Sequence, residues 1–235
     1  MNVKTLSDSA LLLTLGDAID PRVNRRVHAL AARLAAHPLA GVSECVPAYA
    51  SLTAHYDPLL VGESQVAEWL RREAAGADEE ASRGSRRVEV PVRYGGEAGP
   101  DLPDVAGLCG LSPAEVVRIH TASEYRVYMM GFTPGFPYMG LLDERLRVPR
   151  LASPRARVPA GTVAIAAAQT GIYPLDSPGG WRLIGRTDLA LLDPTREPPF
   201  LFMPGDCVRF CEEELITDRA QRDTKDLMDA RPKTT

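Results

Sequence analysis

The sequence predicts an α+β N-terminal domain of the two-layer βαββα type, followed by an all-β barrel domain. Three observations support this fold class. Residues 1–70 alternate strand-sized apolar runs with stretches of helical periodicity. Residues 71–87 then carry almost no large apolar side chain. After Tyr125, short apolar segments recur between Gly and Pro residues, which is typical of a compact barrel.

The N-terminal region begins with an apolar run of strand length over 10–15. Asp20 suits an N-cap and Pro21 the first helical position, because a capping carboxylate accepts free N–H groups and proline needs none. Apolar residues then recur at helical spacing as far as Leu34, so we expect an amphipathic helix over 21–36. Strands near 42–46 and 51–56 and a helix opened by Ser64 complete the predicted α+β pattern.

The domain boundary is predicted from the change of composition at about 71–87. This segment cannot bury much apolar surface, so it is interpreted as a linker or an exposed helix end. The predicted organisation is a small α+β domain at 1–86, a barrel domain at 87–211 and a charged C-terminal tail at 212–235.

The barrel domain begins with apolar residues that alternate with polar residues or Pro over 88–94. Ser112 and Glu115 fit a capping box, and Pro113 fits the first position of the helix that they start. That helix is expected to end near His120. Further strand-sized segments follow at 125–130, 162–168, 181–186, 189–192 and 207–211.

Composition excludes several classes of function. The net charge is -4, with 27 basic and 31 acidic residues, so the surface has no general attraction for nucleic acid or anionic lipid. The apolar runs are far shorter than the roughly 20 residues of a membrane-spanning helix, and we expect a cytoplasmic protein. The four cysteines fit free thiols, and no metal site is predicted because no His or third Cys lies near Cys207 and Cys211. The sequence also lacks a phosphate-binding Gly-x4-Gly-Lys-Ser/Thr loop.

Two segments rich in Gly and Pro, 131–140 and 169–187, are candidates for a ligand site. Glycine allows close backbone approach and proline fixes its own φ, so such segments form rigid loops. Aromatic side chains in these loops can wall a small pocket, and polar groups can orient a ligand. The alternative is that the loops are barrel corners whose aromatic residues plug the core. The predicted substrate-binding residues are Phe136, Tyr138, Gln169, Trp181 and Arg186.

Charged and titratable residues add two hypotheses. Arginine suits bidentate binding of carboxylate or phosphate, and Arg186, between Gly185 and Thr187, is the preferred candidate. For the arginines at 147–157, a solvated surface with paired charges is the favoured interpretation. His120 is the predicted catalytic residue, because an imidazole titrates near neutrality and can act as a general base. The alternative is a capping or packing role at the end of its helix.

These motifs resemble the family of the 5-oxoprolinase B subunit, KipI and allophanate hydrolase subunit 1, over about residues 5–211. The resemblance is carried by Val90-Pro91-Val92-x-Tyr94-Gly95-Gly96-Glu97, His120, Tyr128-Met129-x-Gly131-Phe132-x-Pro134-Gly135-Phe136-Pro137-Tyr138, Pro149-Arg150, Pro154-Arg155-x-Arg157-Val158-Pro159-Ala160-Gly161, Gln169-Thr170-Gly171-Ile172-Tyr173-Pro174, Ser177-Pro178-Gly179-Gly180-Trp181, Ile184-Gly185-Arg186-Thr187 and Pro204-Gly205-Asp206.

The resemblance implies a cyclophilin-like barrel and a role as the B subunit of an ATP-dependent 5-oxoprolinase, which hydrolyses 5-oxo-L-proline to L-glutamate. The implied partners are a C subunit, of the allophanate hydrolase subunit 2 type, and an A subunit. ATP would be consumed by the complex, and the chain would be inactive alone. Other branches of the family imply two alternatives, which are inhibition of histidine kinase autophosphorylation, as in KipI, and a role in urea or allophanate metabolism.

Overall fold

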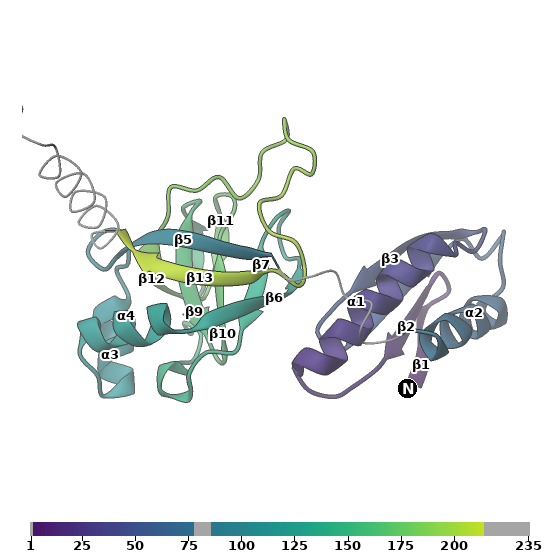
Figure 1. The fold of residues 1–235 in the computed structure, drawn as a ribbon, viewed down its shortest axis with the longest axis horizontal. Coiled ribbons are helices and arrows are strands. Elements are labelled where there is room, and N and C mark those ends of the chain that lie inside the picture. Colours follow the sequence, from purple (N-terminus) through teal and green to yellow (C-terminus); the bar gives the residue numbers. More distant parts are fainter. Residues whose placement is uncertain (1, 78–85, 214–235) are drawn as a thin grey trace, which may run out of the picture. The chain divides into compact units, whose positions relative to one another are not determined.

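The structure is a computed structural model in which residues 2–77 and 86–213 are described (Figure 1). The chain forms two compact units. One comprises the chain up to Arg86 together with Tyr128–Met130, and the other comprises Arg87–Val127 and the chain from Gly131 onward. Each unit has its own buried cluster of apolar side chains, so each is described separately.

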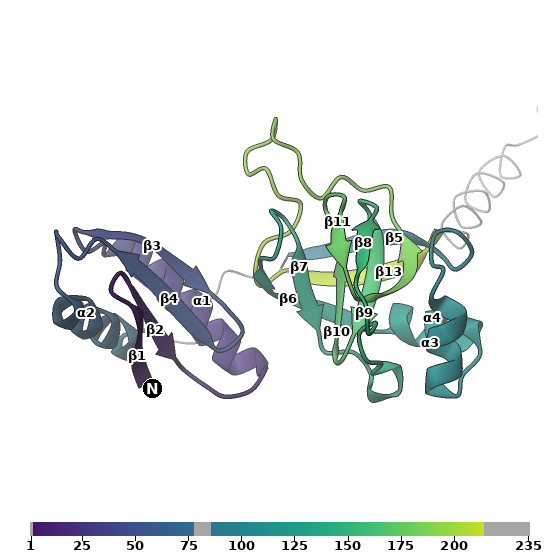
Figure 2. The ribbon, with the colours of Figure 1, turned by 180° about the vertical axis from the view of Figure 1, so that it is seen from behind.

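In the first unit, two helices cover one face of an antiparallel sheet. The strand order is β1-β2-β4-β3, so β4 pairs with both β2 and β3. Helix α1 lies in front of the strands in Figure 1 and behind them in Figure 2. The elements are β1 (Asn2–Ser7), β2 (Ala10–Thr14), α1 (Pro21–Ala36), β3 (Val42–Pro47), β4 (Ser51–Tyr56) and α2 (Glu63–Ala75).

Helix α1 begins at the predicted residue because Asp20 caps it. Asp20 Oδ1 accepts hydrogen bonds from the backbone N–H groups of Arg22 at 2.7 Å and Val23 at 3.1 Å. One face of the helix then packs on β2 and β4. The residues it contacts alternate along each strand, because every second side chain of a strand points to the same face of the sheet. The buried core includes Leu11, Leu13, Val27, Leu30, Leu34, Leu52, Trp69 and Leu70.

The second unit is built on a barrel. Among the described residues, seven strands close it in the order β10-β7-β6-β13-β5-β12-β9. The barrel closes where β9 pairs with β10. Strands β5 and β13 pair in parallel from Arg87 opposite Cys207 to Val92 opposite Glu212 and lie side by side in Figure 1. The strands are β5 (Arg87–Tyr94), β6 (Glu124–Met130), β7 (Pro137–Gly140), β9 (Thr162–Ala166), β10 (Gln169–Ile172), β12 (Arg182–Arg186) and β13 (Cys207–Glu212).

Two helices and a small sheet accompany the barrel. Helix α4 (Pro113–Ala122) starts with the predicted capping box, in which Ser112 Oγ accepts from the Glu115 N–H and the Glu115 carboxylate accepts from the Ser112 N–H. Helix α3 (Leu102–Cys109) precedes it, and a short 3₁₀ helix, η2, spans Glu144–Leu146. Strands β8 (Arg155–Val158) and β11 (Ser177–Gly179) form the separate two-stranded sheet.

The predicted fold class, an α+β unit followed by a barrel, is confirmed, with several differences in detail. The segments 131–140 and 169–187 are not loops throughout, because β7, β10 and β11 form within them by pairing with distant residues. Strand β1 and helix α3 were not predicted, because β1 is mostly exposed and α3 is short and contains Gly107. No strand forms over 189–192, where an isolated bridge joins Leu192 to Phe200. Residues 71–75 of the predicted linker belong to α2, while 78–85 and the tail from 214 lie outside the described residues.

Candidate ligand-binding site

A pocket of about 240 Å³ opens in the second unit and is walled mainly by aromatic side chains. Its volume is below the roughly 300–1,000 Å³ that is usual for drug-sized ligands, so it suits a small molecule. Its walls contain no acidic residue and no Ser, Cys or His side chain among the described residues. The lining residues are Phe132, Phe136, Tyr138, Arg150, Pro154, Tyr173, Pro178, Gly179, Gly180 and Trp181.

Phe136 lies at the centre of the aromatic wall. Its ring makes edge-to-face contacts with Tyr138, Tyr173 and Trp181, at centroid separations of 4.8, 5.2 and 5.6 Å. These residues come from positions just before or within β7, just after β10 and just before β12. The barrel therefore assembles a wall from segments that are up to 45 residues apart in the sequence, from 136 to 181.

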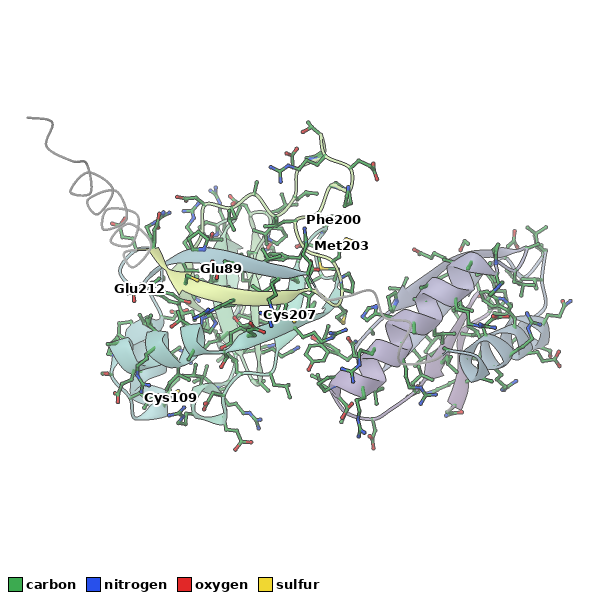
Figure 3. All side chains as sticks on the ribbon, in the orientation of Figure 1. Glu89, Cys109, Phe200, Met203, Cys207 and Glu212 are labelled. Atoms are coloured by element: carbon green, nitrogen blue, oxygen red, sulfur yellow. The ribbon has the colours of Figure 1, made fainter. Side chains whose placement is uncertain are left out.

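Glycine is required at two positions beside this wall. Gly135 has φ of 84°, and a Cβ there would lie 3.2 Å from the ring of Phe200, on the segment before β13 (Figure 3). At Gly179 a Cβ would lie 2.2 Å from the Tyr173 hydroxyl oxygen. The Gly-rich character of the two loops thus allows the backbone to approach aromatic side chains closely.

Arg150 supplies the only formal charge among the pocket-lining residues. Its Cζ atom lies 5.9 Å from the centroid of the Trp181 ring, which is within cation–π range. Burial raises the pKa of Tyr138 and of Tyr173 above the usual value, and the nearby Arg150 guanidinium opposes both shifts. The two hydroxyls therefore stay protonated at neutral pH.

Asp101 and Arg155 form an ion pair behind the pocket. Arg155 Nη2 donates to Asp101 Oδ1 at 2.6 Å, and the Leu183 N–H donates to Asp101 Oδ2 at 2.7 Å. Asp101 is 5% exposed, so both carboxylate oxygens are buried and satisfied. Arg155 pairs with the pocket residue Gly179 across β8 and β11, so the ion pair helps to fix that wall.

His120 does not line the pocket, and its ring is completely buried within the second unit. Thr170 Oγ1 donates to the Ala164 carbonyl, so it accepts from His120 Nε2–H at 3.0 Å, and His120 Nδ1 accepts from the Tyr94 hydroxyl at 2.7 Å. Burial lowers the pKa of His120 to about 3, so the ring is neutral at physiological pH. These contacts match the packing alternative for this histidine.

The other predicted site residues divide into two groups. Phe136, Tyr138 and Trp181 are brought together in the pocket, whereas Gln169 and Arg186 are not among its lining residues. Gln169 lies on β10 opposite Gly140 of β7, and exposed Arg186 donates from Nε to the Ala160 carbonyl at 3.1 Å.

Three further residues, Phe132, Arg150 and Tyr173, line the pocket and were not predicted as site residues. The sequence does contain features that could have indicated these residues. Phe132 and Tyr173 belong to the two Gly- and Pro-rich segments, and Arg150 belongs to the Pro149-Arg150 motif. Arg150 was grouped with arginines whose charges were expected to be paired. Its neighbours Arg147 and Arg157 do pair, with Glu144 and Asp176 respectively.

Comparison with known proteins defines the family. The family model described as carboxyltransferase domain, subdomain C and D, matches residues 1–202. The chain belongs to this family. It is 47% identical to the 5-oxoprolinase B subunit of Bacillus subtilis, over 88% of this chain and 91% of that protein. It is 42% identical to the 5-oxoprolinase B subunit of Escherichia coli O157:H7, over 89% and 94% of the two chains.

A solved structure extends this comparison to a longer protein. The crystal structure of TTHA0988 superposes with a TM-score of 0.77 at 45% identity and covers 86% of this chain. The match spans 39% of the TTHA0988 chain, so a domain of this family occurs there within a longer polypeptide.

The described residues form neither a metal site nor a membrane-spanning helix. Among residues 2–77 and 86–213, no group of three or more His, Cys, Asp or Glu side chains is arranged to hold a metal ion. Over the same ranges, every helix is too short or too polar to span a membrane.

Proposed function

We propose that this chain is the B subunit of a cytoplasmic ATP-dependent 5-oxoprolinase, which hydrolyses 5-oxo-L-proline to L-glutamate. The observation that carries the proposal is the similarity of 41–47% identity to three bacterial 5-oxoprolinase B subunits, over about nine-tenths of the chains. The similarity extends over nearly the whole length of this chain and of those B subunits, so it covers both units of the fold.

The aromatic pocket is the proposed place where the substrate binds. 5-Oxoproline is a five-membered lactam with one carboxylate, and a small ring fits in the pocket that Phe136, Tyr138 and Trp181 help to line. The hydroxyl of Tyr173 is suited to donate to the lactam carbonyl. His120 and Arg186 are assigned no contact with the substrate in this proposal, because neither lines the pocket.

The remaining chemistry is assigned to partner chains. The described lining residues offer no general base or nucleophile, and the sequence has no phosphate-binding loop. We therefore expect this chain to position the lactam, while the A and C subunits contribute ATP-dependent activation of the amide and attack by water. The longer TTHA0988 chain supports such a division, because there the matched region is joined to additional polypeptide.

Co-expression with candidate A and C subunits tests the proposal. Glutamate release from 5-oxo-L-proline is measured with ATP, and each of the three chains is omitted in turn. We expect activity in the complete assembly and none without this chain. A complete, folded assembly that releases no glutamate would refute the proposal and favour the two alternatives, histidine kinase inhibition or a urea-linked role.

A further inference from the structure

The aromatic pocket carries an unneutralised positive charge. Arg150 is the one charged residue among its walls, and no described acidic side chain forms an ion pair with it. The guanidinium lies over the Trp181 ring. This cation–π contact does not use the N–H groups of the guanidinium, which can still donate hydrogen bonds. Such a group attracts an anion to the pocket and can bind it through two parallel hydrogen bonds.

The other arginines near the pocket have partners. Asp101 neutralises Arg155 at 2.6 Å, and Asp104 lies 3.7 Å from Arg182. Exposed Arg147 and Arg157 pair with Glu144 and Asp176, which removes most of their attraction for a further anion. Of these arginines, Arg150 alone combines a place in the pocket with a charge that no described acid balances.

We propose that the aromatic pocket binds a small ring-shaped carboxylate and that Arg150 binds its carboxylate group. The aromatic rings contact the apolar edge of the ligand, while the Tyr173 hydroxyl faces its polar substituent. Asp101 and Arg155 act as positioning residues, since their ion pair supports the wall at Gly179. The identity of the ligand as 5-oxo-L-proline rests on the proposed function, whereas the preference for a carboxylate rests on the pocket itself.

Binding to the full chain tests this inference with two matched ligands. 5-Oxo-L-proline carries the carboxylate, and 2-pyrrolidinone is the same lactam without it. Calorimetry gives the affinities, and the emission of Trp181 reports occupancy of the pocket above the constant signal of Trp69, which is buried in the other unit. We expect 5-oxo-L-proline to bind more tightly than 2-pyrrolidinone, by about tenfold or more, as for a charge-assisted hydrogen bond.

Arg150→Gln is expected to remove this preference without changing the binding of 2-pyrrolidinone, and Arg150→Lys to restore part of it. The matched control is Arg147→Gln, three residues earlier and also exposed, which should bind both ligands as the wild type does. An unchanged preference in Arg150→Gln, or an equal loss for both ligands, would overturn the inference.

The assembled enzyme separates this inference from the proposed function. If the assembly hydrolyses 5-oxo-L-proline but Arg150→Gln leaves KM unchanged, the role of Arg150 is wrong and the proposed function stands. If the assembly is inactive while the chain binds cyclopentanecarboxylate in an Arg150-dependent way, the proposed reaction is wrong and the carboxylate site stands. Absence of carboxylate binding in both the chain and the assembly would reject the site.

Discussion

The second unit contains two aromatic clusters that differ in how their polar groups are satisfied. Around His120, the rings of Tyr125 and Phe210 stack at 5.2 and 4.5 Å, and both imidazole nitrogens have hydrogen-bond partners. Around Phe136, similar ring contacts surround an open pocket whose one cation has no described acid beside it. The first cluster is closed and neutral, whereas the second is open and charged.

This difference is the basis for proposing that the first cluster serves stability and the second serves binding. A buried imidazole with a strongly lowered pKa stays neutral, so near pH 7 it neither accepts nor releases a proton. An unpaired guanidinium beside aromatic rings costs little free energy while water solvates it, and it gains a favourable interaction when an anion binds. A titratable residue in a motif is therefore weaker evidence for catalysis than an unsatisfied charge in a pocket.

The largest expected effect comes from His120→Ala. The change removes a fully buried ring and leaves the Tyr94 hydroxyl without its partner, so the free energy of unfolding should fall by about 3–5 kcal/mol. Urea unfolding followed by fluorescence measures the loss. His55→Ala, at a half-buried position on β4, is the control and should cost much less. A stable His120→Ala protein whose assembly has lost activity would instead restore the catalytic hypothesis.

The pocket wall is tested by Gly179→Ala, with Gly180→Ala as its matched control. A Cβ at Gly179 would lie 2.2 Å from the Tyr173 hydroxyl, whereas a Cβ at Gly180 would have its nearest neighbour at 3.7 Å, in Pro154. We expect Gly179→Ala to destabilise the chain by about 1–3 kcal/mol and to raise KM, because Tyr173 must move into the pocket. Gly180→Ala should change stability by no more than about 0.5 kcal/mol. Similar results for both variants would contradict the described geometry.

The pH dependence of stability reports on the closed cluster. The folded chain keeps His120 neutral down to about pH 3, whereas the unfolded chain takes up a proton below its ordinary pKa of 6.5. Stability from this residue is therefore complete above pH 6.5 and is lost as the pH falls, by about 1.4 kcal/mol per pH unit. Unfolding measured between pH 7 and 5 should show a slope that rises toward this value near pH 5, and His120→Gln should remove it. An equal slope in the variant would assign the effect to other groups.

The smallest effect is expected for Arg186→Gln. The side chain is exposed, lies outside the pocket and donates to the Ala160 carbonyl, so KM and kcat of the assembled enzyme should change by less than about twofold. Kinetic measurement beside Arg150→Gln makes the comparison direct. A KM that rises more for Arg186→Gln than for Arg150→Gln would place the carboxylate at Arg186 instead.

Several features follow from local sequence alone. Asp20 with Pro21, and Ser112 with Glu115, start α1 and α4 as predicted, because capping depends on side chains within three residues of the helix start. The alternation over 88–94 predicts β5 for a similar local reason. Helix α3 was missed because it is short and is stabilised by packing on other elements, such as the distant strand β12. Strand β1 was missed because it is a mostly exposed edge strand, which carries no alternation of apolar and polar residues.

Short-range patterns of apolar, Gly and Pro residues were enough to predict the fold class, the capped helices and the two segments that contain the aromatic pocket residues, although both segments include strands and not only loops. Which of the candidate residues meet depends on the tertiary fold. The fold places Phe136, Tyr138 and Trp181 in one wall, encloses His120, and leaves Arg150 rather than Arg186 beside the pocket. The physical reason is that burial and charge pairing depend on residues far apart in the chain, so spacing in the sequence cannot show which charge remains without a partner.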